Sequence, residues 1–347
     1  MIRSQNHLRV CLFIDGLDEY ENGTEGSYSD MISFFEWLTA SGSFKVCLSS
    51  RPWLVFEDSF RSCRTLQLQH LTRTDIVLYT NDKLSSHKRM MELRSRNPEE
   101  SDALIQEIVS KASGVFLWIT LVVKSLMDGF TNRDRISDLQ KRLLLLPPDL
   151  ETLYRHMFMN HINPLYYEQS SRIFQVIRAV KDGLGSDSIS LLTLSFTDEQ
   201  EDGLALKAEL GPWSESEISH KCHEMTSILN SRCMGLLEVS SNYPDQQTNR
   251  ESTVDFIHRS AYEFLALPDI WKIILSRTKK SFDPYLRLLE AYILIIKVAT
   301  TSSPEGGLQE IEDHIFDALL SAREARKSPN GVDILLLDEL DKTVASY

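Results

Sequence analysis

The fold of the first seventy residues is decided by Val10–Glu19, which reads VCLFIDGLDE. An apolar run ends abruptly in the carboxylates Asp15, Asp18 and Glu19, and Gly16 allows a tight turn between them. This pattern is typical of a buried parallel strand that delivers acidic side chains to the edge of a sheet. Carboxylates at such an edge can hold a hydrated Mg²⁺ and orient a water molecule against a nucleoside triphosphate. The simpler interpretation is a solvated acidic turn.

The segments around this run predict an α/β unit. Its expected elements are a strand at Arg9–Ile14, a polar loop at Glu21–Ser29, a helix at Asp30–Ala40, and strands at Phe44–Leu48 and Thr65–Leu68. A strand–helix–strand connection of this length forms a right-handed parallel crossover, so the strands end at one edge of the sheet. Arg51 follows the second strand, and we expect this cation to lie where a phosphate would be sensed.

From Leu71 onward the apolar spacing becomes helical. Asn97-Pro98 predicts a loop at Glu92–Glu100, and Pro147-Pro148 marks a domain boundary. The expected helices are Arg73–Leu84 with Thr72 and Asp75 as a capping box, Ser101–Met127 with a break at Ser113-Gly114, Ile136–Leu146, Asp149–His161, Tyr166–Val180 and Glu215–Arg232. The stretch Ser188–Ser195 fits a helix or a strand.

A hairpin is predicted after the long helix, with strands at Gly235–Val239 and Thr253–Ile257. His258 follows, and Ser260 is expected to cap the next helix. A helix, a hairpin and a closing helix indicate a winged-helix-like module, and the remainder is helical with a break at Ser302–Pro304. The fold class is therefore α/β and then mostly α. The expected domains are 1–70, 71–147 (helical), 148–268 (winged-helix-like) and 269–347 (a helical C-terminal region).

Composition argues against several classes of function. The net charge is −13, so neither nucleic acid nor an anionic membrane surface is an expected partner. The longest apolar run, Val115–Val123, falls well short of the roughly 20 residues that span a bilayer. Five scattered cysteines predict reduced thiols in a cytoplasmic protein.

Six ordered motifs give the chain a family resemblance over Val10–Leu267. It resembles the NACHT-type P-loop NTPases of the STAND class of signalling proteins, and among them the fungal incompatibility-related branch. The motifs are LFIDGLDEY at 12–20, similar to the Walker B segment; SSRPW at 49–53, similar to sensor 1; LQHLTRTDIVLY at 68–79 and GVFLW at 114–118, similar to the helical domain; LPPDLETLY at 146–154, similar to the junction that follows it; and VDFIHRSAYEFL at 254–265, similar to the end of the winged helix.

The resemblance implies a role for each matching residue. Asp15 would hold Mg²⁺ through water, and Glu19, more than Asp18, would position the attacking water. Arg51 would contact the terminal phosphate of ATP or GTP. His258 would contact the bound diphosphate in the closed state, although a half-buried structural histidine is the simpler interpretation. Intact relatives would be nucleotide-dependent switches in innate-immunity signalling that open from a closed monomer to a homo-oligomer and bind protein partners.

One departure from the family pattern limits these implications. The chain contains no G-x-x-x-x-G-K-[ST] sequence, so it has no loop of backbone amides and lysine to bind the β- and γ-phosphates. In the family's sheet the strand before that loop lies between the two strands matched by Phe44–Leu48 and Thr65–Leu68. We therefore expect a C-terminal portion of such an NTPase, with a truncated sheet and weak or no ATPase activity. The alternative is a non-enzymatic interaction scaffold that retains the helical and winged-helix parts.

Overall fold

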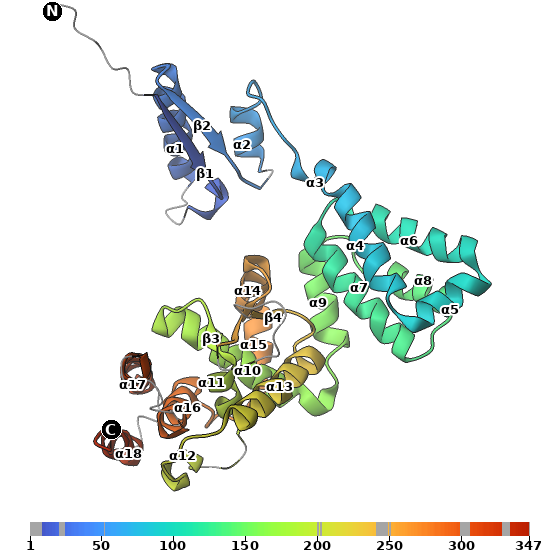
Figure 1. The fold of residues 1–347 in the computed structure, drawn as a ribbon. Coiled ribbons are helices and arrows are strands. Elements are labelled where there is room, and N and C mark those ends of the chain that lie inside the picture. Colours follow the sequence, from blue (N-terminus) through green and yellow to red (C-terminus); the bar gives the residue numbers. More distant parts are fainter. Residues whose placement is uncertain are drawn as a thin grey trace, which may run out of the picture. The chain divides into compact units, whose positions relative to one another are not determined.

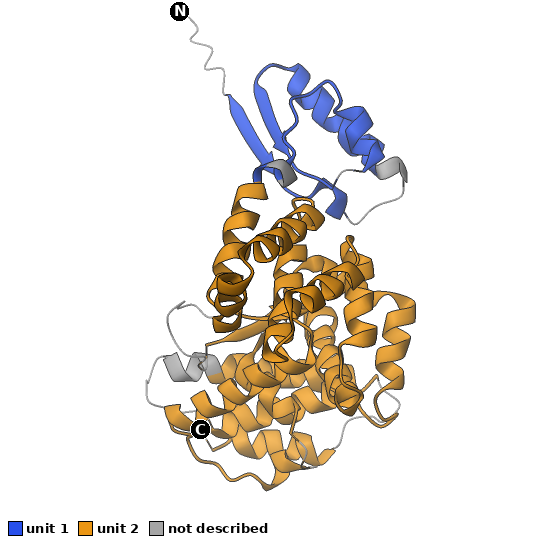
Figure 2. Ribbon diagram, turned by 90° about the vertical axis from the view of Figure 1, so that its right-hand side faces the viewer, with its two compact units in different colours: residues 1–71 blue, residues 72–347 orange. Residues whose placement is uncertain are grey.

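The computed structural model describes residues 9–20, 25–51, 53–199, 201, 203–240, 249, 251–298, 306–327 and 334–346. The chain forms two compact units, Met1–Leu71 (unit 1) and Thr72–Tyr347 (unit 2), shown in Figure 2. It is mostly helical (69%), with a two-stranded parallel sheet near its N-terminus and a three-stranded antiparallel sheet. None of the described helices is long and apolar enough to cross a membrane.

Unit 1 is a small α/β layer (Figure 1). Its elements are β1 (Val10–Ile14), the 3₁₀ helix η1 (Leu17–Glu19), α1 (Glu25–Ala40), β2 (Phe44–Leu48), α2 (Leu54–Ser59) and α3 (Leu68–Leu71). The strands β1 and β2 pair in parallel, with Val10 opposite Phe44 and Ile14 opposite Leu48. One face of this sheet packs on the apolar side of α1, around Ile32, Phe35 and Leu38. The first two strands predicted here and the parallel pairing between them are confirmed.

The third strand predicted over Thr65–Leu68 is wrong. Residues 65–67 form no regular structure and Leu68 begins α3, while the side chains of Leu66 and Leu68 are 70% and 63% exposed. A strand needs a neighbour to satisfy its backbone groups, and this segment pairs with neither β1 nor β2. The loop predicted over Glu21–Ser29 is also too long, because α1 begins at Glu25.

Unit 2 begins with a helical bundle that continues into α9 (Figure 1). Its helices are α4 (Arg73–Ser85), α5 (Lys88–Arg96), α6 (Pro98–Ala112), α7 (Phe116–Thr131), α8 (Ile136–Leu145) and α9 (Leu150–Asn160). The predicted break at Ser113-Gly114 is confirmed, since Ser113 has a φ of +48°. Trp118 is fully buried in α7, and its indole N–H donates to the Pro147 carbonyl at 2.7 Å.

The loop predicted over Glu92–Glu100 is wrong. Only Asn97 separates α5 from α6, because Pro98 takes the first helical position, where a missing N–H costs nothing. The predicted capping box at Thr72 does not form either. The Thr72 hydroxyl instead donates to the Gly114 carbonyl at 2.8 Å.

The rest of unit 2 surrounds a small sheet with strand order β3-β5-β4. Its elements are η2 (Pro164–Tyr166), α10 (Tyr167–Ala179), the π-helical turn η3 (Val180–Leu184), β3 (Ile189–Ser190), α11 (Leu191–Thr197), α12 (Leu204–Lys207), α13 (Glu215–Arg232), β4 (Leu237–Ser240), β5 (Thr253–Phe256), α14 (Arg259–Ala266), α15 (Pro268–Ser276), α16 (Pro284–Val298), α17 (Gly306–Ala325) and α18 (Ile334–Val344). The predicted hairpin is confirmed, with β4 and β5 antiparallel.

One hydrophobic core runs through unit 2, with buried residues from Ile76 in α4 to Leu340 in α18. The helix α16 lies at its centre, because it is buried along most of its length and contacts α10, α11, α12, α17 and α18. Ser188–Ser195, which fitted either a helix or a strand, contains both, since β3 runs directly into α11. The predicted break at Ser302–Pro304 lies outside the described residues.

Candidate functional site

The carboxyl ends of β1 and β2 lie side by side, because the two strands are parallel and in register. Two backbone hydrogen bonds extend this pairing beyond the strands: Ser49 N–H donates to the Ile14 carbonyl at 3.0 Å, and Leu17 N–H donates to the Ser49 carbonyl at 2.9 Å. The residues after each strand are therefore held at one sheet edge, where ligands bind in open parallel sheets.

Asp15 and Ser49 meet at this edge. The Ser49 hydroxyl donates to Asp15 Oδ1, and the Gly16 N–H donates to Ser49 Oγ at 3.0 Å. Gly16 has a φ of +69°, a left-handed conformation that glycine adopts without steric cost and that lets the chain turn directly after the strand. Asp15 remains exposed at the sheet edge.

Asp18 is engaged by Arg51 in a two-point contact. The backbone N–H of Arg51 donates to Asp18 Oδ1 at 2.9 Å, and the side-chain Nε of Arg51 lies 3.2 Å from Asp18 Oδ2. The Asp18 side chain is only 5% exposed, whereas that of Arg51 is 42% exposed. Asp18 therefore holds the arginine in place, and its carboxylate has little room to orient a water molecule.

Glu19 ends the turn η1 and is exposed to solvent. Its side chain lies against Gly16, where an added Cβ would come within 2.9 Å of Glu19 Cγ and Cδ. Of the two candidates for positioning water, Glu19 is thus the more accessible. A small glycine beneath it leaves room for this side chain at the sheet edge.

The oxygen atoms of Asp15 and Ser49 are of the kind that Mg²⁺ prefers. Within the described residues, no group of three or more His, Cys, Asp or Glu side chains is arranged to hold a metal ion. Mg²⁺ commonly keeps several waters and binds through one or two protein oxygens together with substrate phosphates. The Asp15–Ser49 pair fits that mode, but the phosphate-binding loop that would complete it does not occur in this sequence.

His258 belongs to unit 2, where it is the N-cap of α14. The prediction that Ser260 caps this helix is wrong, because His258 Nδ1 accepts the Ser260 N–H at 3.1 Å. The Ser260 hydroxyl lies 2.8 Å from the same nitrogen and 3.0 Å from the Tyr154 hydroxyl in α9. His258 is thus fixed by two groups of its own helix turn, one of which also contacts α9.

His258 also lines a cavity of about 540 Å³ between the start of α7 and the end of the hairpin. The cavity is mostly apolar, and its lining comprises Val115, Phe116, Leu117, Thr120, Leu150, Glu238, Ile257 and His258. The GVFLW segment and the segment around His258 are far apart in the sequence, yet both contribute to this wall.

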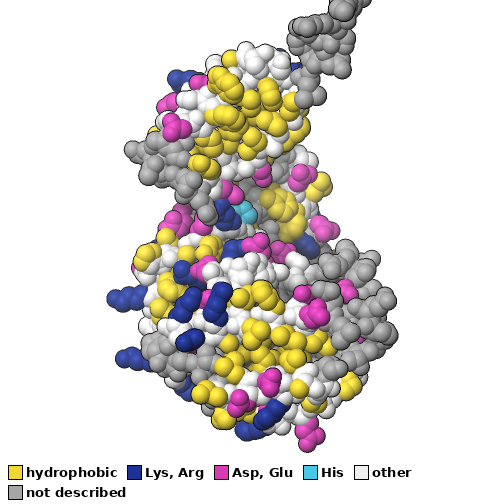
Figure 3. Space-filling view, turned by 90° about the vertical axis from the view of Figure 1, so that its left-hand side faces the viewer, with side chains coloured by type: hydrophobic (Ala, Val, Ile, Leu, Met, Phe, Trp, Pro, Cys, Tyr) yellow, Lys and Arg dark blue, Asp and Glu magenta, His cyan; other side chains and the backbone are white. Residues whose placement is uncertain are grey.

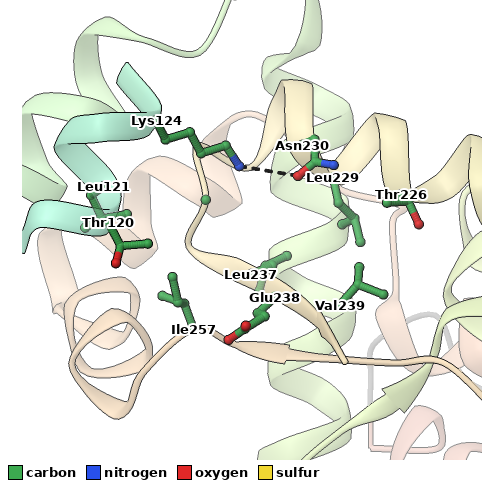
Figure 4. Close-up of a pocket in the computed structure, with 11 residues that line it drawn as sticks. Thr120, Leu121, Lys124, Thr226, Leu229, Asn230, Leu237, Glu238, Val239 and Ile257 are labelled. Atoms are coloured by element: carbon green, nitrogen blue, oxygen red, sulfur yellow. Dashed lines mark hydrogen bonds between the residues drawn. The ribbon is translucent and has the colours of Figure 1, made fainter. Parts of the chain in front are cut away.

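A second cavity, of about 370 Å³, adjoins the first and shares Thr120, Glu238 and Ile257 with it (Figure 4). Figure 4 shows Lys124 extending from α7 toward Asn230 of α13, where its Nζ donates to Asn230 Oδ1 at 3.3 Å. Burial lowers the pKa of Lys124, an effect partly offset by the nearby charge of Asp128. Lys124 lines the second cavity and His258 lines the first.

The predicted site residues therefore fall into two groups. Asp15, Asp18, Glu19 and Arg51 lie together on unit 1, and His258 lies on unit 2. The sequence analysis missed Ser49 as a partner of Asp15, although the parallel register of the two strands places the residues after them side by side. It also missed Tyr154 and Lys124, because contacts between α9 and α14 and around the two cavities depend on tertiary packing.

Comparison with known proteins gives one match. Residues 161–305, from the end of α9 through α16, match a family described as Domain of unknown function (DUF7791). No curated protein and no solved structure matches the chain significantly. The matching family lies within unit 2, covers less than half of the chain and carries no described activity.

Proposed function

We propose that this chain is the C-terminal portion of a NACHT-type signalling NTPase, a nucleotide-dependent switch. Unit 1 supplies the Mg²⁺ and water-positioning edge of a P-loop NTPase sheet. Unit 2 supplies the helical domain, a winged-helix-like module built from α13, the β4–β5 hairpin and α14, and a helical C-terminal region. ATP or GTP with Mg²⁺ is the cofactor of the intact switch, and other proteins or further copies of the switch are its partners in the cytoplasm.

The observation that carries the proposal is the polar network at the carboxyl ends of β1 and β2. Two contacts make up this network: Asp15 with Ser49, and Asp18 with Arg51. They connect two acids that follow the first strand to a hydroxyl and a cation that follow the second. A solvated acidic turn does not require these cross-strand contacts. Carboxylate and arginine at one edge of a parallel sheet suit a metal ion and a terminal phosphate.

The outer face of the sheet supports a larger NTPase core. Cys11, Phe13 and Cys47 are exposed on the face opposite α1, and the Phe13 side chain is 80% exposed. An apolar parallel strand such as β1 is typical of sheets that are covered on both faces, and a two-stranded sheet alone is marginal. Figure 3 shows hydrophobic side chains gathered on the surface of unit 1. We infer that further strands and helices of a longer chain complete this sheet.

Thiol labelling tests this inference. In residues 1–347, we expect Cys11, Cys47 and Cys63 to react with a maleimide, because all three are exposed. Cys222 and Cys233 are buried and should stay unmodified, and burial raises the pKa of Cys233 to about 12. In a chain extended upstream to include the phosphate-binding loop, Cys11 and Cys47 should become protected. Mass spectrometry of single-cysteine variants gives the rate of maleimide labelling at each cysteine.

Cys63 is the matched control, because it lies in unit 1 outside the strands and should label at the same rate in both chains. Equal labelling of Cys11 and Cys47 in the short and the extended chain would argue against a completed sheet.

Nucleotide affinity gives a second test. Carboxylates and one arginine cannot replace an amide cradle and a lysine, so residues 1–347 alone should bind Mg·ATP weakly at best. Isothermal titration calorimetry should detect no micromolar binding. A micromolar Kd that is lost in Asp15→Ala would show that this chain holds nucleotide without the phosphate-binding loop. The proposal that the loop is needed to complete the nucleotide site would then be wrong.

The Asp18–Arg51 pair also favours the alternative function. An arginine already neutralised by a carboxylate is less available to a phosphate, as expected if unit 1 no longer turns over nucleotide. In that case the chain is a non-enzymatic scaffold that retains the helical and winged-helix parts. An extended chain that carries the phosphate-binding loop and still fails to bind Mg·ATP would favour the scaffold.

A further inference from the structure

The strand β4 forms one edge of the three-stranded sheet in unit 2. The strand order is β3-β5-β4, so β4 pairs with β5 on one side and with no other strand of the described residues. The Ile257 N–H donates to the Leu236 carbonyl at 3.0 Å, and in an antiparallel ladder the hydrogen-bonded pairs alternate along the strands. Every second residue counted from Leu236 is therefore bonded to β5. The backbone N–H and C=O groups of Leu237 and Val239 point to the other side.

This free edge lies along the cavity of about 370 Å³ shown in Figure 4. Residues 237–239 of β4 line one part of it, and much of the remaining wall comes from α7 and α13. Two of the lining residues, Asn230 and Glu238, are exposed, so the cavity opens to solvent. Backbone donors and acceptors two residues apart beside an open cavity are what the addition of a further strand requires.

Lys124 places a cation in the wall of this cavity. Its Nζ donates to Asn230 Oδ1 at 3.3 Å, a long hydrogen bond that uses one of the three donors of the ammonium. Burial lowers the pKa of Lys124 and outweighs the opposing charge of Asp128. A carboxylate brought into the cavity would compensate this charge and accept the remaining donors.

We propose that the free edge of β4 binds an extended peptide segment that carries a carboxylate side chain and adds to the sheet as a further strand. The peptide backbone pairs with Leu237 and Val239, and its carboxylate contacts Lys124. The adjoining cavity, whose wall includes Phe116 and Leu117, has room for an apolar side chain of the peptide. Main-chain hydrogen bonds then give affinity and the side-chain contacts give specificity. The site belongs to unit 2 alone, so the proposal stands whether or not unit 1 binds nucleotide.

The shape of the site favours a single extended chain over other occupants. At about 3.3 Å per residue, a peptide of roughly four residues runs along β4. A second copy of the chain would have to insert a strand of a folded sheet between β4 and the helices α7 and α13, and a cavity of about 370 Å³ does not admit one. A small apolar molecule would fill the cavity but leave the backbone groups of Leu237 and Val239 unbonded.

Selection from a phage-displayed library of random heptapeptides tests the proposal, with residues 1–347 and the Val239→Pro variant as targets. Proline at 239 removes an outward N–H but no hydrogen bond between β4 and β5, and edge strands tolerate it there. The wild-type chain should select peptides that alternate apolar and polar residues and contain Asp or Glu. A synthetic selected peptide should bind Val239→Pro roughly 10-fold more weakly or less, because one hydrogen bond is lost and the proline ring occupies the edge.

Lys124→Met tests the charge, and it keeps the proposal testable if a thermal melt shows that Val239→Pro does not fold. The affinity for the selected peptide should fall roughly 10-fold or more, the contribution of one hydrogen bond to a charged group. Lys141→Met is the matched control, because Lys141 is an exposed lysine of α8 that pairs with Asp138 at 3.5 Å. It should leave the affinity unchanged.

Amide hydrogen exchange identifies the mode of binding. In the free chain the amides of Leu237 and Val239 should exchange faster than those of Glu238 and Ser240, and the selected peptide should slow the first two. Peptides that leave these two amides unprotected, or that bind Val239→Pro and Lys124→Met as tightly as the wild-type chain, would overturn the proposal. So would a selection that enriches no peptide. A dimer in light scattering that dissociates in Val239→Pro would replace the peptide with a second copy of the chain.

Discussion

Replacing Glu19 by glutamine should slow nucleotide hydrolysis by about 10²- to 10⁴-fold in a chain extended upstream to include the phosphate-binding loop, the range that a positioned general base contributes. Glu19 is the exposed carboxylate at the end of η1, whereas Asp18 is held by Arg51. Glutamine keeps the shape of the side chain but cannot accept the proton of the attacking water. Nucleotide binding should therefore persist while turnover falls. Calorimetry and a steady-state phosphate-release assay measure the two effects separately.

Two variants in the same unit make this result specific. Glu36→Gln changes an exposed carboxylate on α1 in the same way and should leave turnover at the parental rate. Asp18→Asn removes the ionic partner of Arg51 and should change the affinity for the triphosphate more than the chemical step. Parental turnover in Glu19→Gln, or a larger loss of turnover in Asp18→Asn, would reverse the roles given to these two carboxylates.

The parts of the fold that the sequence predicted well depend on local patterns. The apolar runs of β1 and β2 and the long helical segment of α13 are local patterns, and their predicted bounds are within one residue of the structure. Thr65–Leu68 failed because its alternation of apolar and polar residues describes a strand, whereas this segment pairs with neither β1 nor β2 and leads into α3. Glu92–Glu100 failed because Pro98 was interpreted as a helix breaker when it opens a helix.

Only one feature of the candidate site could be predicted from the sequence: which residues directly follow the two parallel strands. The acids after β1 and Arg51 after β2 are adjacent because the parallel register makes them so. The partner of each acid was not predictable, since Asp18 could have faced solvent as well as Arg51. The cap of α14 was assigned to Ser260 because serine is a common N-cap, but here a histidine nitrogen takes that place and the serine hydroxyl extends the contact to α9.

The other large effect concerns stability, and it centres on Lys297. This lysine of α16 is only 3% exposed, and its ammonium donates to the carbonyls of Ala205 and Ala208 and to Glu339 Oε1 at 2.8, 2.7 and 2.6 Å. All three donors of the ammonium are used, so the buried charge is satisfied. The contacts join the central helix of unit 2 to the α12 segment and to α18.

Replacing Lys297 by methionine should lower the free energy of unfolding of unit 2 by about 3–5 kcal/mol, because removal of one partner leaves the half-buried Glu339 carboxylate without its nearest counter-ion. The carbonyls of Ala205 and Ala208 also lose their hydrogen-bond donor. Chemical denaturation should show a lower midpoint at an unchanged slope. Hydrogen exchange should be faster in the amides of α18, whose attachment to α16 includes this ion pair.

A double-mutant cycle distinguishes the ion pair from simple packing. Glu339→Leu alone should also be strongly destabilising, because it leaves the buried ammonium without an anion, whereas Lys297→Met with Glu339→Leu should recover much of the loss since neither charge remains. Lys342→Ala is the surface control: its ammonium is 3.8 Å from Glu339 Oε2 and largely exposed, so its loss should cost no more than about 0.5 kcal/mol. Strictly additive single and double variants would mean that Lys297 and Glu339 stabilise the fold independently and that the ion pair does not couple α16 to α18.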